Sequence, residues 1–396
     1  MIKLPHPNIW KLFAIKGALW FMIIMPIIVL FFQDNGLNLQ EIMILQACYS
    51  LSVGLMEIPS GYAADILGRR KTLILGCILA FIGFSIFSVS YNFWWFLVAE
   101  IILGLGNSFI SGADTAIMYD SLLEAKAEDR FMKYEGRSIS IGNFSEAAAG
   151  VLGGFLAAIS FRYPAYAQVF IGLLAIPFAF ALVEPKMHMQ RQKTSWKGVL
   201  GVVRFSLIES KILRTHIIYS SAIGVATLMM AWLAQPFLKD IGISMKHYGM
   251  IWALLNITVG VFSFLAHRIE LKMNAMNSLV IVGVSSVLGY VLIANNMSLF
   301  GLFILFVFYA NRGYATPLLR NYINQYADSD VRATVMSVRS FVIRVSFAII
   351  APCIGWLADN YSLTIAFTTM GIIVFLVVGP CLVWFSKNRV WALANS

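Results

Sequence analysis

Charged side chains are scarce in this 396-residue sequence. Asp, Glu, Lys and Arg together make up 12 % of the residues, whereas soluble globular domains carry about 25 %. Hydrophobic residues reach 60 %. So few charges and so much apolar surface exclude an ordinary soluble domain, and the composition indicates a protein that crosses a membrane many times.

Reactive groups are sparse as well. The five histidines lie far apart, and no G-x-S-x-G, H-E-x-x-H or phosphate-binding G-K-S pattern is present. The cysteines occur singly inside apolar runs, at Cys48, Cys77, Cys353 and Cys381. We therefore expect no enzymatic activity, no metal and no cofactor, and an ion gradient rather than ATP as the source of energy.

Long apolar runs predict membrane-spanning helices. A hydrocarbon core about 30 Å thick requires about 20 helical residues at a rise of 1.5 Å each. Twelve runs are long enough, at residues 11–33, 40–62, 72–91, 94–121, 135–160, 166–184, 214–238, 245–266, 276–294, 298–324, 337–358 and 364–386. Their length excludes the short strands of a barrel, so the predicted fold class is an all-α integral membrane protein with twelve transmembrane helices.

Basic residues are concentrated in one set of alternate loops and in both termini. The other set of loops contains only Arg162, Lys239 and Lys246. Because the positive-inside rule places loops rich in Lys and Arg in the cytoplasm, we expect both termini to be cytoplasmic. The net charge of +10 then requires no nucleic acid, and the partner it indicates is the lipid bilayer.

An internal repeat divides the chain into halves. At an offset of 202 residues, Arg130 and Arg137 align with Arg332 and Arg339. We expect two pseudo-symmetric six-helix bundles, 1–184 and 214–396, of the kind that encloses a central cavity. Basic and apolar residues alternate at helical spacing in the connection 185–213, which predicts an amphipathic linker helix. A solvated basic loop is the alternative.

The most specific motif lies between the second and third apolar runs. Its residues follow one another at fixed spacing: Gly61, Asp65, Gly68, Arg69, Arg70 and Lys71. With the helix number and the six-plus-six organisation, this motif resembles the major facilitator superfamily over the whole chain, and most closely its bacterial drug and metabolite transporters. The resemblance implies a multi-pass protein of the bacterial inner membrane, and we expect a monomer.

The basic residues of this motif suit a gate. Arg69 and Arg70 have three candidate partners for an ion pair, namely Asp120, Glu124 and Asp129. The alternative is that the basic trio only anchors the topology. The matching loop of the second half, residues 267–272, lacks the motif, so we expect the gate chemistry to be concentrated in the first half.

Carboxylates inside the predicted helices are candidate proton sites. A charge within hydrocarbon costs about 2.5–3.5 kcal/mol, and apolar surroundings favour the protonated form of a carboxylate. Glu100, Asp114 and Glu146 are the proton-coupling candidates, and an interhelical hydrogen bond or ion pair is the structural alternative for each. Glu100 stands where the resemblance to proton-coupled drug antiporters implies Arg. For Lys16 we expect an amine that reaches toward the inner surface.

Polar and aromatic residues of the second half are candidate substrate ligands. They are Asn311, Arg312, Tyr314, Arg344, Trp232 and Gln235. The planar donors of Arg suit a carboxylate or phosphate, which favours an organic anion such as a carboxylate metabolite or a siderophore. The acidic residues of the first half and the many aromatics favour a lipophilic cationic drug instead. A salt bridge from Arg312 to a carboxylate of the first half is the structural alternative.

The sequence therefore predicts a secondary active transporter that moves a small organic molecule by alternating access, with proton coupling. Import and export both stay open, as do symport and antiport. A sensor built on a transporter scaffold is a remote alternative, because we expect neither terminus to hold an output domain.

Overall fold

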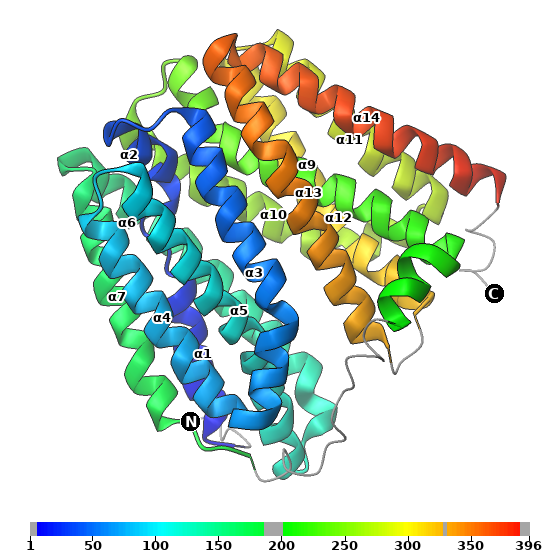
Figure 1. Ribbon diagram of the computed structural model, residues 1–396. Coiled ribbons are helices and arrows are strands. Elements are labelled where there is room, and N and C mark those ends of the chain that lie inside the picture. The colour runs from blue at the N-terminus through cyan, green and yellow to red at the C-terminus, as the bar shows by residue number, and fades with distance from the viewer. Residues whose placement is uncertain (1–5, 186–200, 328–330, 389–396) are drawn as a thin grey trace. The chain divides into compact units, whose positions relative to one another are not determined.

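The structure is a computed structural model that describes residues 6–185, 201–327 and 331–388, apart from a few side chains within these ranges, that of Asp65 among them. In the described ranges every regular element is a helix (Figure 1). Twelve helical segments there are long and apolar enough to cross a membrane. The predicted fold class and number of spans are confirmed.

The helices of the first half follow one another with short connections. They are α1 (Asn8–Trp20), the 3-10 turn η1 (Met25–Ile27), α2 (Ile28–Asp34), α3 (Leu39–Leu67), α4 (Arg69–Val89), α5 (Phe93–Glu124), the 3-10 turn η2 (Glu128–Arg130), α6 (Phe131–Ile159) and α7 (Arg162–Ala181).

The second half has the same pattern. Its elements are the π-helix η4 (Phe205–Glu209), α9 (Lys211–Asp240), the 3-10 turn η5 (Met245–His247), α10 (Tyr248–Glu270), α11 (Ala275–Asn295), α12 (Leu299–Gln325), α13 (Arg332–Asn360) and α14 (Leu363–Lys387). Of the predicted amphipathic linker, residues 186–200 lie outside the described part of the chain, and 201–204 are helical.

Contacts between Cα atoms divide the chain into two compact units. One unit comprises Met1–Leu37, Cys48–Thr194 and Met245–Ala253, and the other comprises Asn38–Ala47, Ser195–Ser244 and Leu254–Ser396. Each unit is described by itself below. The boundaries 1–184, 185–213 and 214–396 inferred from the sequence stay a proposal.

The first apolar run, 11–33, is broken in the middle. Phe21 has φ −79° and ψ 68°, the geometry of an inverse γ-turn, and the amide of Met22 donates to the carbonyl oxygen of Trp20 at 2.9 Å. The buried amide of Ile23 donates to the side-chain oxygen of Gln168 on α7, at 2.8 Å. A side chain of another helix thus replaces the hydrogen bond that the break removes.

Close helix contacts hold the first unit together. Helix α4 packs on α5 and α7, and α1 packs on α5, α6 and α7. A Cβ atom at Gly106 of α5 would lie 3.0 Å from the backbone nitrogen of Ala80 on α4, so only glycine allows this approach. Fully buried phenylalanine rings from α2, α4 and α5 fill one end of the unit: Phe31, Phe32, Phe87 and Phe96.

Arg162, at the start of α7, ties this aromatic end together. One guanidinium nitrogen donates to the carbonyl oxygens of Ser88 at 3.0 Å and Ser90 at 2.7 Å. The other terminal nitrogen donates to the side-chain oxygen of Asn35. The guanidinium carbon lies 3.7 Å from the centroid of the Tyr91 ring. These contacts explain an arginine in a set of loops that is otherwise poor in basic residues.

Helix α9 is the centre of the second unit. It packs on α11, α12, α13 and α14. Two buried tyrosines fix its contact with α11: the Tyr219 hydroxyl donates to the carbonyl oxygen of Leu279 at 2.6 Å, and the Tyr290 hydroxyl donates to that of Ala226 at 2.5 Å. Both hydroxyl groups are therefore hydrogen-bonded within an otherwise apolar contact, as buried tyrosine hydroxyls usually are.

We predict that Arg162→Lys lowers the free energy of unfolding by about 2 kcal/mol or more, because each hydrogen bond to a charged group contributes about 1.5–3 kcal/mol and an ammonium group cannot reproduce the planar fork. The thermal unfolding midpoint of the purified protein in detergent measures this loss. The exposed Arg130→Lys variant is the control, and equal midpoints for the two variants would contradict the role of the fork.

Candidate functional site

The hairpin between α3 and α4 is held by a carboxylate that no local sequence pattern predicts. Glu184, just after α7, accepts hydrogen bonds from the backbone amides of Arg69 and Arg70, each at 2.8 Å. Gly68 has φ +93°, and a Cβ atom there would lie 3.1 Å from a carboxylate oxygen of Glu184. The positive φ therefore favours glycine, a Cβ atom would crowd the carboxylate, and Glu184 caps the positive end of α4.

The two arginines of the hairpin have different partners. Arg69 forms a buried ion pair with Asp120 of α5, with side chains 4 % exposed on both sides, and also donates to the carbonyl oxygen of Ala116 at 2.7 Å. Arg70 donates to the carbonyl oxygen of Phe180 on α7, at 2.7 Å. Of the three expected carboxylates the structure selects Asp120. Glu124 and Asp129 are exposed.

The remaining residues of the motif are less constrained. Lys71 is exposed, and a Cβ atom at Gly61 would meet nothing within 4 Å among the described atoms. The side chain of Asp65 lies outside the described residues. The part of the motif with described contacts is therefore Gly68, Arg69 and Arg70, which join α4 to α5 and α7.

In the second unit a single carboxylate and its hydroxyl donors lie at the place that corresponds to this hairpin in the repeat. Glu270, at the end of α10, accepts hydrogen bonds from the hydroxyls of Ser278 at 2.5 Å, Tyr314 at 3.0 Å and Tyr322. At the offset of 202 residues, Tyr322 corresponds to Asp120. In the second half neutral hydroxyls donate to Glu270, whereas in the first half Arg69 forms an ion pair with Asp120. Polar side-chain contacts are thus present at this position in both halves.

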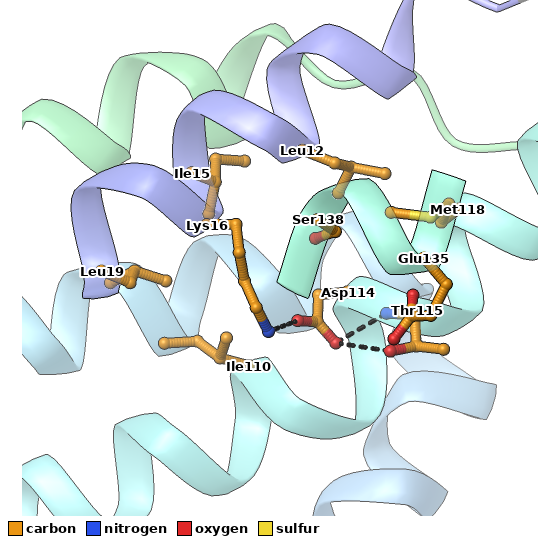
Figure 2. A pocket seen from close by; sticks show the side chains of 10 residues that line it. All are labelled: Leu12, Ile15, Lys16, Leu19, Ile110, Asp114, Thr115, Met118, Glu135 and Ser138. Carbon is orange, nitrogen blue, oxygen red and sulfur yellow. Dashed lines mark hydrogen bonds and ion pairs between the residues drawn. The ribbon is translucent and has the colours of Figure 1, made fainter. Parts of the chain in front are cut away.

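A charged cavity lies among α1, α5 and α6 (Figure 2). The Lys16 amine forms an ion pair with Asp114 at 3.1 Å, with side chains 21 % and 16 % exposed. The backbone amide of Thr115 donates to the other oxygen of Asp114 at 2.6 Å. Lys16 therefore has a specific partner within the bundle, and Asp114 is its counter-ion.

The cavity is small and has mixed walls. Its volume is about 10 Å³, close to the smallest space that holds one water molecule. Figure 2 shows the residues that line it: Leu12, Ile15, Lys16, Leu19, Ile110, Asp114, Thr115, Met118, Glu135 and Ser138. Glu135 was not among the predicted residues. It precedes Glu146 by about three helical turns and so lies near the same face of α6. This spacing of two carboxylates is the sequence pattern that could have indicated Glu135.

The other two proton-coupling candidates lie elsewhere. Glu100 is 4 % exposed on α5, and Glu146 is half-buried on α6. Neither lines the cavity of Lys16 and Asp114. The structure therefore does not gather Glu100, Asp114 and Glu146 into one cluster.

The substrate candidates on α12 point in different directions. Asn311 is buried and donates to the Ser286 hydroxyl on α11 at 2.9 Å, and Tyr314 belongs to the Glu270 cluster. Arg312 instead lies over the ring of Tyr309, 5.7 Å from its centroid. The side chains of Asn311 and Tyr314 thus form hydrogen bonds with residues of α11, and of the three candidates only Arg312 takes no part in that helix contact.

The remaining candidates belong to α9 and α13. Trp232 and Gln235 of α9 are buried, with 8 % and 2 % exposed. Arg344 of α13 is half-buried, and its buried Nε atom has no hydrogen-bond partner among the described residues. An arginine nitrogen in that state is available to an incoming acceptor.

The profile of the Major Facilitator Superfamily matches residues 13–346. The chain belongs to this superfamily. Solved structures of a mutant of nucleoside transporter NupG and of a D-xylose–proton symporter have the same fold. Their TM-scores are 0.81 and 0.71 at 15 % and 13 % identity. The matches cover 96 % and 94 % of this chain, and 98 % and 96 % of the other.

Two curated proteins are also similar to this chain. The quinolone resistance protein NorA of Staphylococcus aureus (strain MSSA476) is 25 % identical over 244 residues, which cover 59 % of this chain and 61 % of NorA. The uncharacterized MFS-type transporter YxaM of Bacillus subtilis (strain 168) is 22 % identical over 379 residues, or 93 % of each chain. The match spans less than two thirds of NorA. The superfamily and these neighbours are transporters, not enzymes.

We predict that Asp120→Ala lowers the free energy of unfolding by about 3–5 kcal/mol, because it leaves the buried guanidinium of Arg69 uncompensated. The double variant Arg69→Met, Asp120→Leu should recover most of this loss, since it removes both charges. Thermal unfolding of the wild type, Arg69→Met, Asp120→Leu and the double variant, the four species of a double-mutant cycle, measures the coupling.

Glu124→Ala is the matched control for this cycle, because Glu124 lies one turn further along α5 and is exposed. Its unfolding midpoint should stay near that of the wild type. Additive effects of the Arg69 and Asp120 substitutions would show that the pair contributes nothing as a pair.

Proposed function

We propose that this chain is a proton-coupled exporter of amphiphilic organic molecules in a bacterial inner membrane, working by alternating access as a monomer with both termini in the cytoplasm. The observation that carries the coupling is the Lys16–Asp114 ion pair inside an apolar bundle. Charges are costly in a membrane and are found where ions or substrates pass. One of the similar structures is that of a D-xylose–proton symporter, which supports the same coupling ion.

The size of the cavity favours protons over cargo as its ligand. A space of about 10 Å³ admits one water molecule and excludes any organic substrate. Apolar side chains such as Leu19, Ile110 and Met118 line the cavity together with the charged groups. Protonation of a carboxylate there changes the local charge without admitting a larger ligand.

The cargo is proposed from similarity and charge. NorA is named for quinolone resistance, and a transporter gives resistance by lowering the internal concentration of a drug. The buried or half-buried carboxylates Glu100 and Glu146 of the first half favour a molecule with a positive group. Quinolones carry an aromatic body together with such a group, so they are the first cargo class to test.

We predict that the protein in liposomes drives norfloxacin movement under an imposed pH gradient, and that norfloxacin in turn moves protons. Asp114→Asn should reduce the proton-driven rate at least tenfold, because it removes the carboxylate that holds the Lys16 amine. A pH-sensitive dye inside the liposomes and drug fluorescence measure both fluxes. Glu124→Gln is the control, and a wild type that moves drug without any proton movement would contradict the coupling.

An organic anion is the second candidate cargo. It is favoured by one observation, the buried Nε atom of Arg344 that has no hydrogen-bond partner among the described residues. A carboxylate could accept from this nitrogen and pair with the guanidinium charge.

Ligand-induced stabilisation separates the two cargo classes, because only a ligand of the folded state raises the unfolding midpoint. We predict a rise with norfloxacin and with the lipophilic cation tetraphenylphosphonium, and none with citrate. A rise with citrate that disappears in Arg344→Gln would instead assign the anion as cargo.

A further inference from the structure

We infer that Glu135, Asp114 and Lys16 form a single proton-binding site, in which Lys16 pairs with whichever of the two carboxylates is ionised. This inference rests on the proposed proton coupling and deepens it, because it names the site and adds Glu135, a residue outside the predicted set. The ligand is one proton, and the cavity has room for one water molecule that carries it between the carboxylates.

Three helices bring the three groups together. Lys16 comes from α1, Asp114 from α5 and Glu135 from the second turn of α6, and all three line the same cavity. Figure 2 shows the Glu135 side chain directed toward Thr115, whose hydroxyl lies 3.2 Å from Asp114. A proton that leaves one carboxylate therefore meets the other within a shared polar space.

The balance of charge limits the site to one proton. With both carboxylates ionised, the cavity contains one ammonium and two negative charges, so one negative charge is uncompensated in apolar surroundings. Binding one proton makes the site neutral, and like charges that share a site favour that outcome. In the present structure it is Asp114 that holds the Lys16 amine.

No other charge in the described part of the chain competes for Glu135. The charged groups that act on it are Asp114 of α5 and Lys16 of α1. On its own helix, Lys133 is exposed and Arg137 lies over the Tyr134 ring at 5.6 Å. Helix α7 carries no charged residue after Arg162, and Arg130 of η2 is exposed. The compensating cation is therefore Lys16.

Lys16 also connects the site to the break in the first span. Its amine lies 5.0 Å from the centroid of the Trp20 ring, and Trp20 is the last residue of α1 before the turn at Phe21. A transfer of the amine from Asp114 to Glu135 changes this contact. Occupancy of the proton site thus acts on the one place in the first span where the helix hydrogen bonds are already interrupted.

The test follows protonated carboxyl groups directly and needs no cargo. Infrared difference spectra of the protein in lipid, recorded between pH 8 and pH 5, report the C=O stretch of each carboxyl group that binds a proton in apolar surroundings. Among the protonated carboxyl groups of the wild type, we expect one that disappears in Glu135→Gln and also in Asp114→Asn, because Lys16 then keeps the single remaining carboxylate of the site ionised.

Lys16→Met should act in the opposite direction. Without the ammonium, two carboxylates face each other uncompensated, so a protonated group should be present already at pH 8. Glu124→Gln is the matched control and should retain the wild-type spectrum. Glu135→Asp serves if Glu135→Gln does not fold, and it should keep the protonated group with a shifted frequency.

An unchanged spectrum in Glu135→Gln, or the same pH dependence in Lys16→Met as in the wild type, would overturn the shared site. Transport separates this outcome from a failure of the proposed function. Glu135→Gln should lose at least tenfold in proton-driven norfloxacin movement while it retains exchange of internal for external norfloxacin. A wild type that shows neither proton-driven movement nor exchange of norfloxacin would contradict the proposed cargo, and the infrared result would still test the proton site.

Discussion

Compensation of charge inside apolar helix bundles is the constraint on which the polar structure of this protein depends. A buried guanidinium or carboxylate without a partner costs several kcal/mol, and the two ion pairs of the first unit meet that demand differently. Arg69 pairs with Asp120 in a nearly closed environment, whereas Lys16 pairs with Asp114 beside a cavity. The first arrangement fixes two helices to each other, and the second leaves room for the pairing to change.

The two halves use the same position for different chemistry. In the first half a loop arginine reaches an aspartate near the end of α5. In the second half a loop carboxylate, Glu270, accepts from tyrosine hydroxyls of α12. Each position is thus satisfied, by an ion pair in the first half and by three hydroxyl donors to one carboxylate in the second.

The twelve spans could be predicted because apolar runs fix the helices. For Arg69 the sequence predicts a carboxylate near the end of α5 as partner, and Asp120 is one of four there, with Glu124, Glu128 and Asp129, so packing decides among them. Glu184 could not be predicted as the cap of α4, since it lies 114 residues from Arg70 in the chain and no local pattern connects them. Glu135 was missed because it stands at the first residue of its predicted span, where a carboxylate is ordinarily solvated. The break at Phe21 was missed because its compensation by Gln168 depends on packing.

The size of the charged cavity has a consequence for how transport can be coupled. A space for one water molecule cannot bring cargo and proton into contact, so competition for a common site is excluded at this location. The proton coupling proposed above would then act through helix movement. Helix α1 is suited to this, because Lys16 contacts the cavity on one side and Trp20 at the end of the helix on the other. The turn at Phe21, whose lost hydrogen bond Gln168 replaces, divides the first span at the end of this helix.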